Sequence, residues 1–456
     1  MGAAVAERLR RLFAREVERS QNIFPLLHAT QPSLTKGERM CYTPSRRLLI
    51  WGKPGSQAEP WRENVGNFKK RLEYLIKHNA FVQQTYKIVF CFVLRVLGLF
   101  VPARKGLVLL SDFGGRKYGG SPRILFEAMR DDPRFSSCQW VWAFEEPDRF
   151  DVEGCRKVRM DSPAYYLAAL QAEVWITSVN IERGLHFKKK GTIYVNTWHG
   201  AGTKKIGNAC SGRKDYDFRD VDMMLVQSDF EREIFLRDFN CNPGAIRLFG
   251  FPRNDELFHM GEEQIRAVRR DLDIPEDKRV ILYAPTWRDS KNGGLSYAFD
   301  PPIDLGHWEE ELGADYVVLF RTHPFTTHFT VRFNRFIRDV TPYPNLNHLL
   351  AVTDILITDY STIVYDCVIA KKPFICFGFD YDTYREERSF YFDLNERYPG
   401  GVVRTEGQLL KRIRELEQGA HRDAFAAFRE RYVQAGGNAT EQVMEELARR
   451  LAASEP

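Results

Sequence analysis

One segment of the sequence combines a histidine with glycines and lysines, the residue types that bind and act on phosphate groups. It follows the apolar run 192–198 and reads His199-Gly200-Ala201-Gly202-Thr203-Lys204-Lys205. The glycines let the backbone approach an anion closely, and the lysines add positive charge. Over 181–214, eight Lys or Arg residues stand against a single acid. This field suits a phosphorylated ligand beside a histidine that could carry a proton near neutral pH, although a histidine there could also be a structural hydrogen-bonding group.

A second basic group follows another apolar run. Arg321, Thr322 and His323 come directly after DYVVLF, and Arg253 closes the first half of the chain in the string GFPRND. Cations at the ends of successive strands are difficult to explain by packing alone. Together with the lysines near His199, they indicate a site for a ligand that contains pyrophosphate.

Hydroxyl side chains mark a third strand end. Ser361 and Thr362 precede the apolar helical stretch IVYDCVIA. Such residues are common helix caps, but the free N–H groups of a helix start that faces a cleft also form an anion site. Asp366, about one turn into this helix, is expected to reach a ligand hydroxyl.

The acidic pairs in the sequence do not form a convincing metal site. Asp220 and Asp222 form a D-x-D, but they lie at the entry of an apolar run rather than its exit. Asp380 and Asp382 are better placed, yet a third ligand is not evident. The eight cysteines are scattered and contain no C-x-x-C pair. The sequence therefore predicts a site without a metal or other cofactor.

The elements that must position these residues are two sets of short apolar runs separated by helix-like stretches. The runs are 106–112, 138–144, 173–179, 192–198, 222–228 and 246–250, and then 279–286, 315–322, 354–359, 373–379 and 401–405. Continuous apolar strands that alternate with helices predict parallel sheets covered on both faces. We therefore expect an α/β chain with two doubly wound, Rossmann-like domains facing across a cleft, and ligands at the carboxyl ends of the strands.

The predicted organisation has four parts. They are a partly irregular helical appendage (1–80), an amphipathic apolar segment (81–105), a first Rossmann-like domain (106–258) and a second one with terminal helices (259–456). The apolar run 88–101 is interrupted by Arg95 and is shorter than the roughly 20 residues of a membrane-spanning helix. It could lie on an anionic membrane surface or pack as a buried helix on its own domain.

Composition limits the functional classes. The 456 residues are 44% hydrophobic and 28% charged, which excludes a disordered or low-complexity chain. The net charge of +5 is too small for a protein that coats nucleic acid, and the basic cluster lacks interleaved aromatic residues. We expect no nucleic-acid partner.

Five ordered motifs carry a resemblance to a known family. The strings VNTWHGAGTKKIG, GFPRND, LYAPTWRD, RTHPF and ITDYSTIVYD resemble those of the CDP-glycerol glycerophosphotransferases, bacterial transferases of teichoic-acid and capsule synthesis. The resemblance covers about 100–435. It implies a two-domain GT-B fold, a CDP-polyol donor bound mainly by the second domain, and an acceptor that approaches across the first. It also implies peripheral association with the inner, cytoplasmic face of the cell membrane.

The resemblance also assigns residues. His199 and His323 match the two histidines regarded as essential in the family. The expected substrate contacts are Trp198, Gly200, Ala201, Gly202, Arg253, Pro285, Thr286, Arg321, Thr322, Ser361, Thr362 and Asp366, with Lys204 and Lys205 as a patch for phosphate or acceptor. The family usually has Thr-Pro where this chain has Ala201-Gly202, and the appendage is a second departure.

The resulting hypothesis is a polyol-phosphate transfer. An acceptor hydroxyl attacks the β-phosphorus of a CDP-polyol and CMP leaves, with His199 as general base and His323 and Arg321 on the pyrophosphate. Glycerol phosphate is the first choice of transferred group, and the acceptor is a lipid-linked or saccharide polymer. Three alternatives remain: a CDP-ribitol donor, a GT-B glycosyltransferase that uses a nucleotide sugar, and a non-catalytic scaffold.

Overall fold

The computed structural model of the chain describes residues 80–200, 202–286, 302–321 and 333–453. Three predicted site residues, Ala201, Thr322 and His323, lie outside the described residues. The predicted appendage, apart from its last residue, lies outside them as well.

The first sheet is built from the first set of apolar runs. In the described part of the chain it has seven parallel strands in the order β3-β2-β1-β4-β5-β6-β7. They are β1 (Arg104–Ser111), β2 (Gln139–Phe144), β3 (Arg156–Arg159), β4 (Ala172–Thr177), β5 (Ile193–Asn196), β6 (Met223–Leu225) and β7 (Ile246–Arg247). Because the chain leaves β1 towards β2 and returns to β4 on its other side, the sheet has its switch point between β1 and β4.

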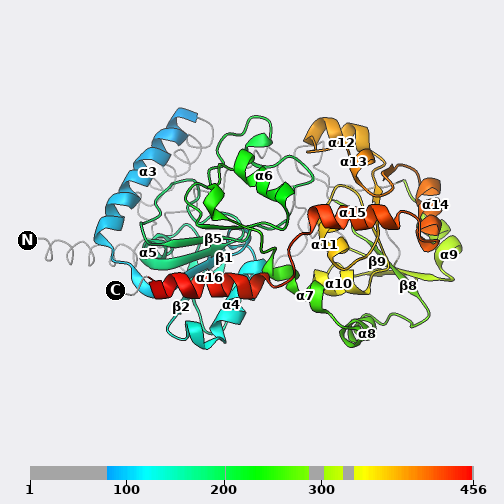
Figure 1. Cartoon of the computed structure of the whole chain (residues 1–456), viewed down its shortest axis with the longest axis horizontal. Helices are drawn as coiled ribbons and strands as arrows, with labels where there is room; N and C mark the ends of the chain where they lie inside the picture. Colours follow the sequence, from blue (N-terminus) through cyan, green and yellow to red (C-terminus); the bar gives the residue numbers. More distant parts are fainter. Residues whose placement is uncertain (1–79, 201, 287–301, 322–332, 454–456) are drawn as a thin grey trace, which may run out of the picture.

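The second sheet repeats the arrangement. Its six described strands are all parallel and follow the order β10-β9-β8-β11-β12-β13, so that the switch point lies between β8 and β11. They are β8 (Arg279–Tyr283), β9 (Tyr316–Phe320), β10 (Ile337–Asp339), β11 (Ile355–Thr358), β12 (Phe374–Phe377) and β13 (Val402–Val403). Figure 1 shows the two sheets side by side.

Helices cover the sheets because successive strand residues point to opposite faces. In β8, Val280 and Leu282 join one buried cluster, whereas Ile281 and Tyr283 join another on the opposite face. The helices of the first half are α3 (Ala80–Phe100), α4 (Gly120–Arg130), α5 (Pro163–Gln171) and α6 (Asp229–Asp238). Those that follow are α7 (Asp255–His259), α8 (Glu262–Asp271), α9 (Leu305–Leu312), α10 (Leu346–Val352), α11 (Ile363–Ile369), α12 (Tyr381–Arg388), α13 (Leu394–Arg397), α14 (Glu406–Glu417), α15 (Arg422–Tyr432) and α16 (Ala439–Ala453).

The last helix returns to the first sheet. In Figure 1, α16 runs back from α15 beneath the first sheet. Its Val443 and Leu447 belong to the first core, and its Glu446 pairs with Arg247 of β7 at 2.7 Å. The domain boundaries stay a prediction. A division at residue 258 assigns α16 to the second domain, although it packs on the core of the first sheet.

Helix α3 lies at the outer edge of the first sheet (Figure 1). Its Leu94 is buried in the first core, whereas Phe92 and Leu99 are 67% and 83% exposed. Among the described residues, none of the helices combines the length and the apolar character that a membrane crossing requires.

Candidate active site

The carboxyl ends of both sheets open into one cavity of about 1200 Å³. Eleven of the predicted site residues that the structure describes line it. They are Trp198, His199, Lys204, Lys205, Arg253, Pro285, Thr286, Arg321, Ser361, Thr362 and Asp366. Residues that follow five different strands are thus brought together at the junction of the two sheets.

The conformation of the segment after β5 fixes His199. Trp198 has a positive φ of 49°, and its backbone N–H donates to Asn196 Oδ1 at 2.9 Å. Its indole packs on Phe235 and Phe239 in the first core. The chain therefore turns sharply after a buried anchor, and the next side chain, His199, lines the cavity.

The hydrogen bonding of His199 determines its tautomer. Nδ1 lies 2.8 Å from the backbone carbonyl oxygen of Ser178. Because a carbonyl only accepts, Nδ1 carries the hydrogen, and Nε2 is left as the nitrogen that can accept a proton from a ligand. Burial, with smaller contributions from Arg253 and Lys117, lowers the pKa of His199 to about 4. The ring is therefore neutral near pH 7.

Glycine is required at position 200. Its φ is +151°, and a Cβ there would lie 3.1 Å from Oγ1 of Thr362, which precedes α11 in the second sheet's half. The segment after β5 therefore passes close to the start of α11 across the cavity. Gly202, in contrast, is buried beside Tyr391 and Ile234 and does not line the cavity.

Arg253 and Asp366 meet across the junction. Nη2 of Arg253 lies 3.2 and 3.3 Å from the two carboxylate oxygens of Asp366, and Asn254 donates to the same carboxylate at 2.7 Å. The carboxylate is thus held by protein donors. A contact between Asp366 and a ligand hydroxyl stays a prediction.

The second sheet contributes polar groups from both sides of its switch point. Thr286, after β8, donates its backbone N–H to Asp359 Oδ1 at 2.8 Å and bonds the same oxygen through its hydroxyl. Ser361 Oγ accepts the backbone N–H of Ile363 at 3.3 Å in a local turn, and Thr362, the N-cap of α11, makes no side-chain cap bond. Arg321 donates to the carbonyls of Val340 and Tyr343, which fixes its guanidinium at the cavity wall.

The segment that carries the two lysines is tied to the second half of the chain. The backbone N–H of Lys205 donates to Ser389 at 3.1 Å, and that of Tyr391 donates to Thr203 at 3.1 Å. Lys204 Nζ donates to Tyr384 Oη at 3.4 Å. Lys204 and Lys205 therefore lie at the end of the cavity closed by 384–391.

Sequence reasoning missed the residues that the loop after β1 brings to the cavity. Asp112, Phe113 and Lys117 line it, and Ser178 holds both Asp112 and His199. The available signal was position: Asp112 directly follows β1 and Ser178 directly follows β4. An aspartate or serine after an apolar run is too common to stand out, unless the strand order is known.

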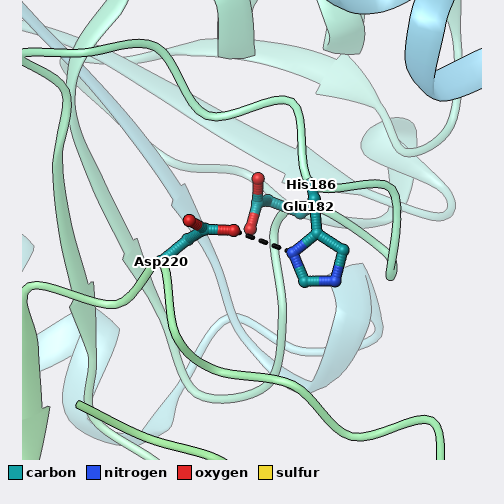
Figure 2. Close-up of side chains that lie close together, drawn as sticks. All are labelled: Glu182, His186 and Asp220. Atoms are coloured by element: carbon teal, nitrogen blue, oxygen red, sulfur yellow. Dashed lines mark hydrogen bonds and ion pairs between the residues drawn. The ribbon is translucent and has the colours of Figure 1, made fainter.

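Three residues of types that can bind a metal lie close together (Figure 2), and none of them lines the cavity. Potential ligand atoms of Glu182, His186 and Asp220 lie within 4.8 Å of one another. His186 Nδ1 bonds Asp220 at 2.8 Å, and Glu182 accepts the backbone N–H of Lys188 at 2.8 Å. The hydrogen bond to Asp220 raises the pKa of His186, and burial raises that of Glu182. His186 and Asp220 therefore form an ion pair, whereas Glu182 is bonded to the backbone.

The other acidic pairs considered in the sequence are also bound to protein groups. Asp222 pairs with Lys188 at 3.0 Å and accepts the backbone N–H of Tyr194. Asp380 accepts the hydroxyl of Tyr360 at 2.8 Å, and Asp382 pairs with Arg404. Each carboxylate has a local structural role.

Known proteins resemble this chain over most of its length. The sequence model of the CDP-glycerol:poly(glycerophosphate) glycerophosphotransferase family matches residues 93–449. The teichoic acid poly(glycerol phosphate) polymerase of Bacillus subtilis strain 168 is 30% identical over 404 residues, which cover 81% of this chain and 53% of the polymerase. This chain thus spans about half the length of that relative.

Other relatives are closer to it in size. The teichoic acid glycerol-phosphate transferase of Staphylococcus aureus strain NCTC 8325 / PS 47 is 29% identical over 77% of this chain and 92% of the transferase. A solved structure of the wall teichoic acid polymerase TagF matches with a TM-score of 0.70 and 27% identity, covering 88% of this chain and all of the other. Teichoic acid ribitol-phosphate polymerases also match.

These similarities confirm two predictions from the sequence. The TagF match, with two parallel sheets covered by helices, confirms the GT-B architecture. The family match covers the same region as the five motifs and confirms the resemblance. The chain therefore belongs to the CDP-glycerol:poly(glycerophosphate) glycerophosphotransferase family.

Proposed function

We propose that this protein transfers a polyol phosphate, with glycerol phosphate as the first choice, from a CDP-polyol to a hydroxyl of a teichoic-acid or capsule-polymer acceptor. CMP is the second product. The observation that carries the proposal is a neutral His199 whose Nε2 is available in a cavity between two sheets, surrounded by cations.

The charge of the cavity fits a substrate with several phosphates. Among the described residues that line it, nine are Lys or Arg and three are acids. The cations are Arg116, Lys117, Arg183, Lys204, Lys205, Arg213, Arg253, Arg321 and Arg388. One of the acids, Asp366, already pairs with Arg253. The excess of positive charge therefore favours a pyrophosphate donor and a phosphate-bearing acceptor.

The proposed step is a single displacement at phosphorus. His199 Nε2 takes the proton of the acceptor hydroxyl as its oxygen bonds to the β-phosphorus. The bond from this phosphorus to the CMP oxygen breaks, and CMP leaves with the electron pair. Positioning and charge stabilisation supply most of the acceleration in such transfers. Arg321 and Arg253 line the cavity, and in this proposal they and His323 bind the pyrophosphate of the donor.

The proposal includes association with the inner face of the cytoplasmic membrane. Helix α3 exposes a row of apolar side chains, with Ile88 60%, Phe92 67% and Leu99 83% exposed. Exposed Arg95 lies beside them, and Arg104 and Lys105 follow the helix. An apolar face flanked by cations suits an anionic lipid surface.

The membrane contact is testable with vesicles. The double variant F92S/L99S should lose sedimentation with phosphatidylglycerol vesicles and remain folded, because both side chains are largely exposed. Leu248→Ser is the matched control, since Leu248 is 43% exposed on β7's side of the molecule, outside α3. Equal sedimentation of both variants and the unchanged chain would exclude α3 as the contact.

The activity is tested by following CMP. The purified chain is incubated with CDP-glycerol or CDP-ribitol and a pool of lipid-linked and saccharide acceptors. We expect CMP from one donor, only when acceptor is present, and this result also identifies the polyol. Turnover of a UDP-sugar without CMP from either donor would contradict the proposal and favour a glycosyltransferase.

A further inference from the structure

The first sheet has a polar group at its switch point to which neither the sequence motifs nor the proposed donor contacts assign a role. Asp112 directly follows β1, and Ser178 directly follows β4, the neighbouring strand across the switch point. In open α/β sheets, ligands bind in the crevice outside this point. The second sheet's switch point already faces the proposed donor contacts Thr286 and Ser361. The first is therefore available to the other substrate.

Asp112 is buried but incompletely bonded. The residue is 1% exposed, and Ser178 donates its hydroxyl to Asp112 Oδ1 at 2.6 Å. Oδ2 has no hydrogen-bond partner among the described residues. Buried carboxylate oxygens are normally bonded, because the loss of hydration is otherwise unfavourable. An oxygen left unpartnered at the cavity wall is therefore suited to a ligand donor.

Ser178 links this carboxylate to the proposed general base. Its hydroxyl holds Asp112, and its backbone carbonyl accepts from His199 at 2.8 Å. The two side chains are thus anchored on one residue and line the same cavity. A ligand that presents one hydroxyl to His199 can present a neighbouring hydroxyl to Asp112.

A cation completes the group. Lys117 Nζ lies 4.8 Å from the centre of the Phe113 ring, and this ring lies 4.9 Å from that of His199. Burial raises the pKa of Asp112 and lowers that of His199, and the charge of nearby Lys117 opposes the first effect and adds to the second. An exposed lysine on the cavity wall suits a phosphate group.

We propose that Asp112 and Lys117 bind the terminal unit of the acceptor, with Oδ2 of Asp112 accepting a hydroxyl adjacent to the reacting one and Lys117 pairing with the unit's phosphate. This inference rests on the proposed function and specifies the acceptor as a polyol phosphate with two neighbouring hydroxyls. Asp112 and Lys117 are acceptor-binding residues in this assignment, and His199 remains the base.

The alternative is that Asp112 supports only the loop. Positions for Cβ atoms at Gly119 and Gly120 lie 3.6 and 3.1 Å from its carboxylate oxygens, so the start of α4 wraps closely around it. A purely structural role would affect the kinetics of donor and acceptor alike. A role in acceptor binding affects the acceptor alone and depends on the acceptor's second hydroxyl.

The experiment compares two soluble oligo(glycerol phosphate) acceptors with CDP-glycerol as donor. One ends in glycerol phosphate, and the other ends in propane-1,3-diol phosphate, which keeps the reacting primary hydroxyl and the phosphate but lacks the neighbouring hydroxyl. The variants are Asp112→Asn and Lys117→Gln. The matched controls are Asp148→Asn, an exposed aspartate in the first half, and Lys411→Gln, whose side chain is 78% exposed on α14.

We expect Asp112→Asn to lower kcat/KM for the glycerol-terminated acceptor by about tenfold or more, as loss of a hydrogen bond to a charged group does. The KM for CDP-glycerol should stay within about twofold. With the propanediol-terminated acceptor, the variant and the unchanged protein should be equally slow. Lys117→Gln should weaken both acceptors alike, and the controls should match the unchanged protein.

Three results would overturn the inference. They are an unchanged kcat/KM of Asp112→Asn for the glycerol-terminated acceptor, an equal loss for donor and acceptor, and a tenfold effect of the variant that persists with the propanediol-terminated acceptor. If the unchanged protein releases no CMP, the proposed function fails instead. Calorimetric titration of the two oligomers into the protein and its Asp112→Asn variant then tests the subsite separately.

Discussion

Each of the two switch points of this molecule has a carboxylate at a strand end, but the two carboxylates differ in how completely they are hydrogen-bonded. In the second sheet, Asp359 after β11 accepts two bonds from Thr286 after β8 and one from the backbone N–H of Tyr360. In the first, Asp112 after β1 accepts the hydroxyl of Ser178 after β4, and its Oδ2 has no partner among the described residues. Each sheet thus has a carboxylate bonded to a hydroxyl from the neighbouring strand end.

This difference indicates that the two carboxylates, Asp359 and Asp112, have different roles. A buried carboxylate held by charge-assisted bonds stabilises the strand ends around it. Burial without full bonding has the opposite effect and raises the pKa of Asp112 from 3.8 to about 6. Residues that are unfavourable for folding are expected where a ligand supplies the missing partner. We therefore interpret Asp359 as a structural residue that stabilises the strand ends, and Asp112 as part of a ligand site.

The largest expected effect lies beside the first switch point. Replacing His199 with Asn keeps a side-chain N–H for the Ser178 carbonyl but removes Nε2. We expect kcat for CMP release to fall about 10²–10⁴-fold, the usual contribution of a general base. Affinity for CDP-glycerol, measured by calorimetric titration, should stay within about twofold. A variant with kcat within tenfold of the unchanged protein would remove His199 from the proton transfer.

The same substitution at the two carboxylates should change stability in opposite directions. At pH 8, Asp359→Asn weakens three bonds to a charged acceptor and should lower the free energy of unfolding by about 2–3 kcal/mol. The raised pKa of Asp112 corresponds to about 3 kcal/mol of unfavourable charge burial. Asp112→Asn removes this charge but buries an amide, so we expect a net gain of about 1–2 kcal/mol.

Thermal unfolding at pH 8 measures both changes. Asp148→Asn serves as the exposed control. Destabilisation by both substitutions, of similar size, would mean that the two carboxylates have the same structural role. It would remove the distinction between Asp359 as a structural residue and Asp112 as a ligand-binding residue.

The sequence predicted the fold in more detail than it predicted the site. All eleven apolar runs contain a strand, because a strand buried on both faces needs a continuous apolar sequence. The two strands that it missed, β3 and β10, lie at sheet edges. Their sequences RKVR and IRD are mostly charged, which is how edges avoid further pairing but leaves no apolar run to detect.

The sequence predicted those site residues whose chemical type alone indicates phosphate binding. Lysines, arginines and glycines after strands were visible, whereas Asp112 and Ser178 become significant only when β1 and β4 are known to be neighbours. The lowered pKa of His199 could not be predicted, because it is caused mainly by burial, which the sequence does not show. The pairing of Arg253 with Asp366 joins residues 113 positions apart, a contact that only the folded chain defines.

Protonation of Asp112, at the first switch point, should also determine how the activity falls at low pH. With its pKa raised to about 6, Asp112 becomes protonated as pH falls through this value and then no longer accepts on both oxygens. The groups that face it are Ser178, Lys117 and Arg253, and His199 titrates near 4. We expect kcat/KM for the acceptor to decline below about pH 6 in the unchanged protein and only nearer pH 4 in Asp112→Asn. If the pH profiles of the unchanged protein and of Asp112→Asn are identical, the decline at low pH is caused by another group.

The smallest expected effect concerns the connection between the two switch points. Thr203 is fully buried, and its hydroxyl lies 3.1 Å from that of Tyr365 and 3.2 Å from that of Tyr398, both in the second half of the chain. It belongs to the same segment as His199, so this contact fixes the base relative to the donor contacts of the second sheet. Valine has nearly the same shape as threonine but lacks the hydroxyl.

Thr203→Val should therefore lower the free energy of unfolding by about 1–2 kcal/mol, because two buried tyrosine hydroxyls each lose a partner. It should also reduce kcat a few-fold, since a small displacement of a base slows proton transfer. Thr203→Ser, which keeps the hydroxyl, should restore kcat more fully than stability. If kcat stays unchanged while stability falls, the first sheet alone positions His199, and the two switch points contribute to the reaction without this connection.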